Sequence, residues 1–371
     1  MVETLPESLP SVMYIISSLD VGGAEKQLLL LASERKKKGA DVIVVSLKKN
    51  GALRSQFQSN GIDVYDLGIN RSIPNPLTLI RLVRLINKYK PKIIHSWMYH
   101  ADLLATIALS MSRRKNLTSL VWSVRCSNMD FSRYSIMLRC VVWCCIKMSG
   151  IPNCITFNSF AGAEIHQSLG YKNRYLKVIG NGVNTELFKP NSLMRKKNRE
   201  LLNIPSNAFV IINIARVDPM KDHKNLLLAL DKLPEVYTIF IGLGTEQFNL
   251  GSQMYGLGRR SDINTLLATS DLIVSCSAFG EGSSNALMEG MACGLPAVAT
   301  DIGDSAYIMG KAGKIVEARN PEKLSSAIQE FLLMPESEIK SYKIAARERM
   351  IKMFSLNQLV ENYEQLYLSI I

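Results

Sequence analysis

The chain has 371 residues, a net charge of +12 and an apolar share of 47%. This length suffices for two packed domains, and this composition argues against disorder. No run of 18 apolar residues occurs, so no membrane-spanning helix is expected. The first residues lack the layout of a signal peptide, and no C-x-x-C pair occurs among the seven cysteines. A cytosolic protein with reduced thiols and without a zinc site is therefore expected.

Strands and helices are predicted to alternate along the first half of the chain. An apolar strand over residues 12–18 leads through Gly22 and Gly23 into an amphipathic helix over 24–38, which Gly39 ends. Further strands are predicted at 41–47, 62–67, 92–96, 119–124, 153–157 and 176–179, with a helix over 76–89. Such alternation predicts a parallel sheet with helices on both faces.

A second unit of the same kind is predicted after a polar linker at 191–207. Its strands are expected at 209–215, 237–241, 272–275 and 297–299, and an amphipathic helix is expected over about 357–371. The predicted fold class is therefore α/β, with two Rossmann-like, doubly wound parallel-sheet domains. Facing domains of this type leave a cleft at the carboxyl ends of both sheets, where ligands are expected.

Positive charge is concentrated in the first half. Residues 1–190 hold 25 Lys and Arg against 12 Asp and Glu, whereas the remainder holds 19 against 20. In the predicted helix, Arg81, Arg84 and Lys88 interleave with apolar residues, which favours a basic face at anionic lipid headgroups. A solvated positive surface is the alternative. Nucleic acid is disfavoured, because aromatic residues make up 7% of the chain and no recognition motif is present.

Two carboxylates, Glu281 and Glu289, lie eight positions apart around a glycine-rich turn and a predicted helix of small and apolar residues. The N–H groups at the start of this helix belong to Asn285, Ala286 and Leu287. These groups and the positive end of the helix dipole suit a phosphate. Because carboxylates beside a phosphate can hold sugar hydroxyls, the stretch suggests a nucleotide-sugar site.

A second motif places two cations after a predicted strand. Arg216 directly follows the strand at 209–215, and Lys221 comes five residues later, just before a helix. A guanidinium fork and a mobile ammonium at this position can neutralise a diphosphate. Alone they would be interpreted as two surface cations at a turn. The presence of Glu281 and Glu289 in the same chain favours the diphosphate site.

These stretches resemble the R-x4-K and E-x7-E signatures of family GT4, the retaining glycosyltransferases with the two-domain GT-B fold. The resemblance runs from about Val12 to Tyr367. Residues 97–104, 218–223 and 303–306 are similar to bacterial transferases that build O-antigen or capsule repeat units. Ser283 and Ser284 replace an apolar residue and Pro that are common in the family. Tyr307 stands where an acidic residue is common.

The resemblance implies a role for each motif residue. Arg216 and Lys221 would hold the donor diphosphate, Glu289 the ribose, and Glu281 the transferred sugar. The further donor-binding residues that it implies are Gly22, Gly23, Gly282, Asn285, Ala286, Leu287 and Arg259. Arg216, Lys221, Glu281 and His100 are the catalytic candidates, with His95 as the rival of His100. No cofactor or metal is expected, because two cations already neutralise the diphosphate.

Two tryptophans leave alternatives open. Trp97 is expected either in the core or stacked on a sugar. The stretch 140–145, which contains Trp143, is expected to be a buried helix, and a patch at a membrane interface is the alternative.

The implied function is retaining transfer of a sugar from a nucleotide-sugar, expected to be a UDP-linked hexose or N-acetylhexosamine. The implied acceptor is a polyprenyl-diphosphate-linked saccharide in O-antigen or capsule biosynthesis. Residues 1–190 would bind the acceptor and 191–345 the nucleotide-sugar, while helices within 346–371 would return to the first domain. The expected location is the cytoplasm, peripherally on the anionic inner face of the cytoplasmic membrane. The alternatives are a nucleotide-sugar 2-epimerase of GT-B architecture and a non-catalytic membrane-binding protein.

Overall fold

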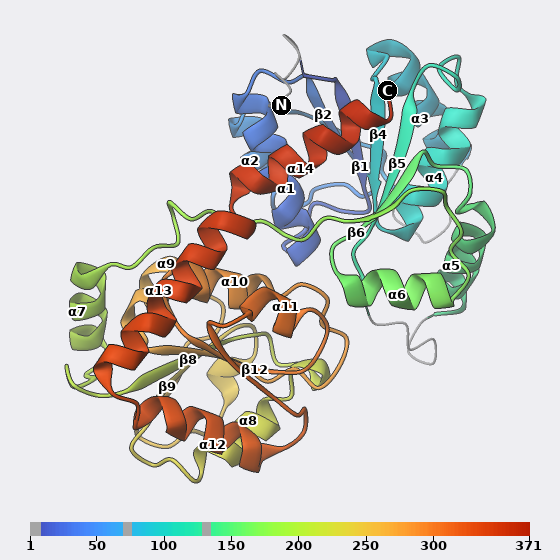
Figure 1. Cartoon of the computed structure of the whole chain (residues 1–371). Helices are drawn as coiled ribbons and strands as arrows, with labels where there is room; N and C mark the ends of the chain where they lie inside the picture. The colour runs from blue at the N-terminus through green and yellow to red at the C-terminus, as the bar shows by residue number, and fades with distance from the viewer. Residues whose placement is uncertain (1–8, 70–75, 128–134) are drawn as a thin grey trace. The chain divides into compact units, whose positions relative to one another are not determined.

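A computed structural model describes residues 9–69, 76–127 and 135–371, and the chain divides into two compact units (Figure 1). Unit 1 comprises Met1–Asn181 and Leu356–Ile371, and unit 2 comprises Gly182–Ser355. The sequence boundaries at 190 and 346 thus differ from those of the units, which change at 181 and at 356. Each unit is α/β with an all-parallel sheet, as predicted.

The sheet of unit 1 has seven parallel strands in the order β3-β2-β1-β4-β5-β6-β7. The strands are β1 (Val12–Ile16), β2 (Val42–Ser46), β3 (Asp63–Asp66), β4 (Ile93–Trp97), β5 (Ser119–Val124), β6 (Cys154–Phe157) and β7 (Leu176–Val178). The helices are α1 (Gly23–Lys37), α2 (Arg54–Ser59), α3 (Pro76–Tyr89), α4 (Tyr99–Met111), α5 (Ile136–Met148), α6 (Phe160–Ser168) and α14 (Leu356–Ser369). Gly39, with a φ of 83°, follows the end of α1 as the sequence predicts.

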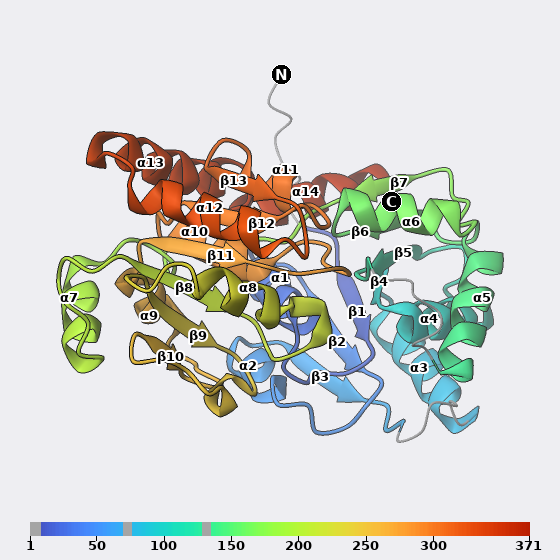
Figure 2. The ribbon, with the colours of Figure 1, turned by 90° about the horizontal axis from the view of Figure 1, so that it is seen from below.

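Two apolar layers cover this sheet, because successive strand side chains point to opposite faces. Tyr14 and Ile16 pack with α1 and α14 on one face, whereas Met13 and Ile15 pack with α3, α4 and α5 on the other. Figures 1 and 2 show these two helix layers. The C-terminal helix α14 is thus part of unit 1. Within the residues that the structure describes, no helix is long and apolar enough to cross a bilayer.

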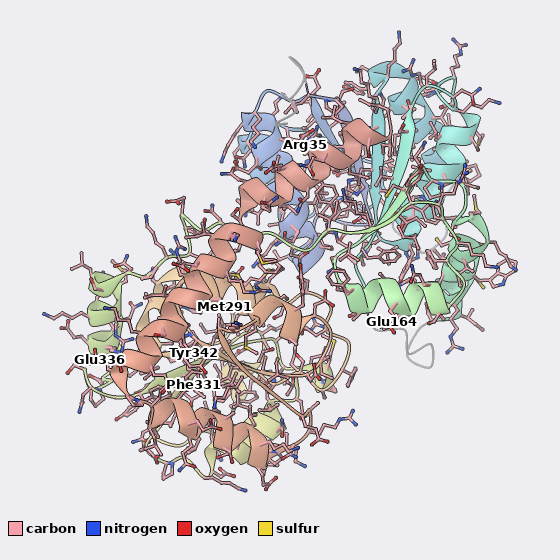
Figure 3. All side chains as sticks on the ribbon, viewed as in Figure 1. Arg35, Glu164, Met291, Phe331, Glu336 and Tyr342 are labelled. Carbon is pink, nitrogen blue, oxygen red and sulfur yellow. The ribbon has the colours of Figure 1, made fainter. Side chains whose placement is uncertain are left out.

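A buried ion pair fastens α14 to α1. Arg35 of α1 is fully buried, and its Nε donates to Glu364 Oε1 at 2.5 Å (Figure 3). Nη2 of the same guanidinium donates to the Pro10 carbonyl at 2.9 Å. The buried charge thus has an ion-pair partner and a backbone acceptor, which offset much of the cost of its burial, while Nη1 of the same guanidinium has no hydrogen-bond partner among the described residues.

The sheet of unit 2 has six parallel strands in the order β10-β9-β8-β11-β12-β13. The strands are β8 (Val210–Ile214), β9 (Tyr237–Ile241), β10 (Met254–Gly256), β11 (Leu272–Ser275), β12 (Ala297–Thr300) and β13 (Gly313–Val316). The helices are α7 (Ser192–Leu201), α8 (His223–Leu230), α9 (Ile263–Thr269), α10 (Asn285–Ala292), α11 (Ser305–Met309), α12 (Pro321–Leu332) and α13 (Glu336–Met353). Short 3-10 turns are η2 (Pro219–Lys221) and η3 (Thr245–Gln247).

Helices cover both faces of this sheet as well. Ile212 and Ile239 lie in one apolar layer with α9, α10, α11 and α13, and Ile211 lies in the other with α8 and α12. Phe331 of α12 and Tyr342 of α13 meet edge to face, with ring centroids 5.1 Å apart (Figure 3). The two layers fix β8, β11 and β12, whose carboxyl ends carry the motifs of the sequence.

Two sequence interpretations are corrected by the structure. The segment at 191–207 contains helix α7, which begins at Ser192 after the capping side chain of Asn191 and is not an extended linker. In the stretch 140–145, Val141, Val142 and Cys145 are buried as expected, but Trp143 is 60% exposed. The reason is the amphipathic placement of α5, which turns only one face to the core.

Candidate active site

The strand β8 ends at Ile214, two residues before Arg216, and a short turn then leads to Lys221. Asp218 shapes this turn: its Oδ1 accepts from the Met220 N–H at 2.9 Å, and its Oδ2 accepts from Arg216 Nη2 at 3.0 Å. Burial alone would raise the pKa of Asp218, but these two donors outweigh it and hold that pKa below its ordinary value. Asp218 therefore stays ionised and keeps the half-exposed guanidinium of Arg216 beside the turn.

Lys221 and Glu281 come together although 60 positions separate them. The Nζ of Lys221 forms an ion pair with Glu281 Oε2, and both side chains are mostly buried. The Oγ of Ser277 donates to the same Oε2 at 3.0 Å. The two motifs of the sequence thus form one charged cluster at the carboxyl ends of β8 and β11.

Backbone contacts fix the loop of Glu281 from two sides. On one side the Ala278 N–H donates to the Met220 carbonyl at 2.8 Å, which ties this loop to the turn before Lys221. On the other side the Asp304 N–H donates to the Gly282 carbonyl at 3.0 Å. Gly303 has a φ of 60°, and a Cβ there would lie 2.0 Å from the Glu281 carbonyl oxygen. Only glycine permits this close approach.

A buried thiol completes the contact between the two loops. Burial raises the pKa of Cys276 to about 12, so this side chain remains a thiol at neutral pH. Its Sγ donates to the Lys221 carbonyl at 3.1 Å. The backbone of Lys221 is therefore held next to the loop that follows β11.

Helix α10 begins next to this cluster. Ser284 caps it, with Oγ accepting from the Leu287 N–H at 3.4 Å, and a small pocket is lined by Lys221, Ser277, Ser284 and Ala286. The backbone of the first helical turn, which begins at Asn285, therefore lies beside the Lys221 ammonium. A helix N-terminus and a cation in one place are suited to an anion.

Two further predicted residues of unit 2, Glu289 and Arg259, differ in their position relative to the cluster of Lys221 and Glu281. Glu289 is half-buried on α10, about one turn after the start of the helix. Arg259 is exposed and follows β10, and no contact joins it to Lys221 or Glu281. The structure thus brings together Lys221, Glu281 and the start of α10, places Arg216 on the same turn as Lys221, and leaves Arg259 separate.

His100, Gly22 and Gly23 belong to unit 1. His100 is the second residue of α4, after Met98, whose φ of 77° is rare for a residue with a side chain. His100 is half-buried, and burial together with the charge of Lys48 lowers its pKa. Gly22 is the N-cap of α1, and Gly23 is the first residue of that helix. Both glycines therefore stand at a helix N-terminus after β1.

His95 and Trp97, by contrast, lie in the core of unit 1. His95 is fully buried, its Nδ1 is 2.7 Å from the Tyr367 hydroxyl, and burial lowers its pKa well below the ordinary value. Trp97 is fully buried under the guanidinium of Arg125, which lies 3.6 Å from the ring centroid. Of the two histidines, only His100 offers its ring to solvent.

Sequence reasoning missed the residues that hold the catalytic candidates. These are Asp218, which holds Arg216, and Ser277, which holds Glu281. A third is Thr300, whose Oγ1 donates to the Ser277 carbonyl at 2.7 Å. A signal existed for Asp218, because Asp followed by Pro is typical of a helical turn's start. The Ser277 contact depends on a fold of the loop that no local pattern encodes.

Two family models match the chain in succession. "Glycosyltransferase Family 4" matches residues 21–187, and "Glycosyl transferases group 1" matches residues 194–349. The two matches together span most of both units, and the gap between them, from 187 to 194, follows the change of unit at Asn181. The chain therefore belongs to the GT4 family of glycosyltransferases, and it has the GT-B fold.

Relatives of known role are distant. The chain is 24% identical to the capsular polysaccharide biosynthesis glycosyltransferase CapM of Staphylococcus aureus over 356 residues, 90% of each chain. It is 21% identical over 313 residues, 79% of each, to the UDP-Gal:alpha-D-GlcNAc-diphosphoundecaprenol alpha-1,3-galactosyltransferase of Escherichia coli. Among solved structures, Anabaena HepE in complex with UDP has a TM-score of 0.83 at 23% identity, covering 97% of this chain and 100% of that one. At this identity the structural likeness establishes the fold alone.

Proposed function

We propose that this glycosyltransferase moves a sugar, with retention of anomeric configuration, from a UDP-sugar to a polyprenyl-diphosphate-linked saccharide during assembly of a surface polysaccharide. The observation that carries the proposal is the cluster of Lys221, Glu281 and the start of α10 beside Arg216. Support for the donor and acceptor classes comes from relatives: HepE was solved with UDP, and the Escherichia coli enzyme acts on a diphosphoundecaprenol-linked sugar.

The donor would occupy this cluster as follows. Its diphosphate takes the place that Glu281 now has at the Lys221 ammonium and draws Arg216 from Asp218, since a diphosphate carries more charge than either carboxylate. The backbone around Asn285 receives the distal phosphate. Glu281, released from Lys221 but still held by Ser277, accepts hydrogen bonds from hydroxyls of the sugar. Glu289 binds the ribose, and Arg259 is the further donor-binding candidate of unit 2, while Gly22 and Gly23 are the candidates of unit 1.

The chemistry needs charge stabilisation more than proton transfer. The bond between the anomeric carbon and the phosphate oxygen breaks, and the acceptor oxygen bonds to the same face of that carbon. The acceptor proton passes to the departing phosphate oxygen. Arg216 and Lys221 stabilise the negative charge that grows on the nucleotide, an effect worth roughly 3–4 kcal/mol per donor group. No metal is required for this step. His100, whose pKa is lowered by burial and by the charge of Lys48, is the candidate of unit 1 for binding the sugar or the acceptor with a neutral ring.

The membrane partner follows from the acceptor and from charge. A polyprenyl carrier resides in a bilayer, and the excess of Lys and Arg in the first half of the chain attracts an anionic surface. We therefore place the enzyme in the cytoplasm, peripherally attached to the inner face of the cytoplasmic membrane.

Thermal unfolding with nucleotides tests the donor site. UDP, GDP, ADP and CMP are added in turn to wild type and to Arg216→Ala, and a ligand at 100 times its dissociation constant adds about 2.7 kcal/mol of stability. We expect UDP alone to raise the melting temperature of wild type, and Arg216→Ala to lose most of that shift. Arg174→Ala, which removes an exposed arginine of unit 1, is the matched control and should retain the full shift.

Turnover tests the reaction itself. UDP should be released from a UDP-sugar only when an acceptor is present, and the product should keep the anomeric configuration of the donor. Conversion of the nucleotide-sugar without an acceptor would instead indicate the epimerase. An inverted product would refute retention, and a Glu281→Ala variant with wild-type turnover would refute the role of this cluster.

A further inference from the structure

Helix α5 of unit 1 carries a solvent-exposed row of large apolar side chains, called the stripe below. Ile136, Cys140 and Trp143 follow one another at spacings of four and three, so they lie on one face of the helix. Ile136 is 78% exposed and Trp143 60% exposed. The opposite face, with Val141, Val142 and Cys145, is buried in the core. The stripe thus lies opposite the face of α5 that packs in the core, and the core does not depend on it.

A shallow apolar groove lies along the same helix. Its volume is about 590 Å³, and its wall includes Ile136, Cys140, Trp143 and Leu169, the last from the end of α6. Exposed apolar area of this extent, gathered on one helix, indicates an interaction site, whereas scattered single residues do not.

The charge around the stripe is positive, which indicates an anionic partner. Arg139 and Lys147 flank it on the same helix, and the Lys147 ammonium lies 5.6 Å from the centroid of the Trp143 ring. From Leu67 to Ala163 the sequence has 13 Lys and Arg but only Asp102 and Asp130 as acidic residues. Asp102 is fully buried, so the charge that the described surface of α3, α4 and α5 shows to solvent is positive.

Helix α3 and the segment that follows α4 extend this positive surface. Helices α3 and α4 lie in the same layer as α5, with α4 packed against both of its neighbours (Figure 1). Exposed cations on this layer are Arg81, Arg84, Lys88, Arg113 and Lys115. A tryptophan beside cations on an amphipathic helix matches the interface of an anionic bilayer, where the ring lies among headgroups and the cations meet lipid phosphates. A protein partner of ordinary mixed charge would not match this excess of exposed cations so well.

We propose that α5 is the membrane anchor of this enzyme: Ile136 and Trp143 enter the headgroup region of an anionic leaflet, and Arg139 and Lys147 bind its phosphates. This assignment rests on the proposed function in one respect, because a polyprenyl-linked acceptor makes membrane attachment useful. The contact itself depends only on α5 and the helices beside it.

Tryptophan fluorescence tests the insertion directly. Among the three tryptophans, Trp97 and Trp122 are fully buried and only Trp143 is exposed. With phosphatidylglycerol vesicles that contain brominated acyl chains, we expect quenching of the Trp143 emission in wild type and none in Trp143→Phe. Absence of quenching in wild type would overturn the proposal, since the ring would then not reach the bilayer.

Vesicle sedimentation tests the contribution to binding. Ile136→Ser and Trp143→Ser together should reduce partitioning into phosphatidylglycerol vesicles roughly ten- to hundredfold, on the basis of the apolar area removed. Leu193→Ser and Leu201→Ser together are the matched control, because these leucines are equally exposed on α7 of unit 2. Equal partitioning of wild type and the α5 variant would overturn the proposal. So would a wild-type dimer that the α5 variant converts to a monomer without any change in vesicle binding.

Activity separates this proposal from the proposed function. The α5 variant should transfer sugar to a short-chain, water-soluble acceptor at the wild-type rate and lose activity only on acceptor embedded in vesicles. If neither protein transfers sugar to any acceptor while Trp143 is still quenched, the anchor stands and the proposed reaction fails. An equal loss on both acceptors would show that α5 serves the fold or the active site and would overturn the anchor.

Discussion

At the residue scale, the carboxylate of Glu281 has two partners of different kinds. Lys221 is a charged partner, whereas Ser277 is a buried hydroxyl whose own carbonyl is held by Thr300. In the proposed mechanism the ammonium turns to the donor diphosphate, and Ser277 alone then orients Glu281 toward the sugar. We therefore propose Ser277 as a positioning residue that acts through Glu281.

Substitution Ser277→Ala should lower kcat roughly tenfold, the equivalent of about one buried hydrogen bond, and leave KM for the nucleotide-sugar nearly unchanged. The reason is that the diphosphate ligands remain while the sugar ligand loses its orientation. Ser112→Ala is the control: that serine is likewise buried, and it donates to the Leu109 carbonyl at 2.8 Å in unit 1, whereas Glu281 belongs to unit 2. Steady-state kinetics with melting temperatures checks both variants. An equal fall in kcat for the two, or a rise in KM alone for Ser277→Ala, would contradict the positioning role.

The sequence could supply the identities of Arg216, Lys221 and Glu281, because each belongs to a motif with fixed spacing. It could not supply their partners. The ion pair of Lys221 with Glu281 joins two loops that meet only because β8 and β11 are neighbours in the sheet. The hydrogen bond from Ser277 likewise requires the loop geometry that Gly303 permits. Whether these residues perform the assigned roles stays a prediction.

At the scale of elements, α6 is fastened to α4 by one buried histidine. His166 of α6 is fully buried; its Nδ1 lies 2.7 Å from the Gly162 carbonyl and its Nε2 lies 2.7 Å from the Tyr99 hydroxyl. Because a carbonyl can only accept, Nδ1 carries the hydrogen, and Nε2 accepts from Tyr99. This arrangement requires the neutral ring, and burial lowers the pKa of His166 to about 4.

Unfolding free energy should therefore fall as the pH falls from 6.5 to about 4. In this window the unfolded chain binds a proton at residue 166 and the folded chain does not, so protonation favours unfolding. The contribution is about 3 kcal/mol, lost on acidification and constant above pH 6.5. Urea unfolding at several pH values checks it. His166→Phe should have a shallower slope; His95, His100 and His223, whose pKa values burial also lowers, contribute to the remainder. Identical slopes for the two proteins would contradict this account.

Periodicity predicted the buried elements well and the polar ones poorly. The helix at 76–89 and the strand at 119–124 have the predicted bounds, because apolar side chains at regular spacing determine which face is buried. Helix α7 was missed, since its residues are mostly charged. Within unit 2, α7 is held to its neighbours through Arg199. The guanidinium of this residue donates to Asp271 at 2.8 Å and to neighbouring carbonyls. A cation that packs as a buried donor leaves no apolar periodicity to detect.

At the scale of the whole molecule, the alternation of elements was enough to predict two parallel α/β units, whereas the unit boundaries were not evident. The chain leaves unit 1 at Asn181 and re-enters it at Leu356. The return depends on contacts such as Arg35 with Glu364, which are 329 positions apart in the sequence. A charge pair at such a separation has no local signature, so only the resemblance to GT4 indicated that a C-terminal helix returns.

The uneven charge of the whole chain makes salt a test of membrane attraction. Because residues 1–190 carry nearly all the excess positive charge, binding to phosphatidylglycerol vesicles should weaken steeply as ionic strength rises from about 0.05 M to about 0.3 M, where screening lengths fall below ~10 Å. Arg84→Glu with Lys88→Glu on α3 should weaken binding at low salt, each cation near the surface being worth about 1 kcal/mol. Lys196→Glu with Lys197→Glu, an equal charge change on α7 of unit 2, should have little effect. If vesicle binding by all three proteins is independent of salt, charge does not contribute to it, and only the apolar stripe of α5 can account for membrane binding. Equal weakening by both charge reversals would mean that net charge, and not a basic face, attracts the bilayer.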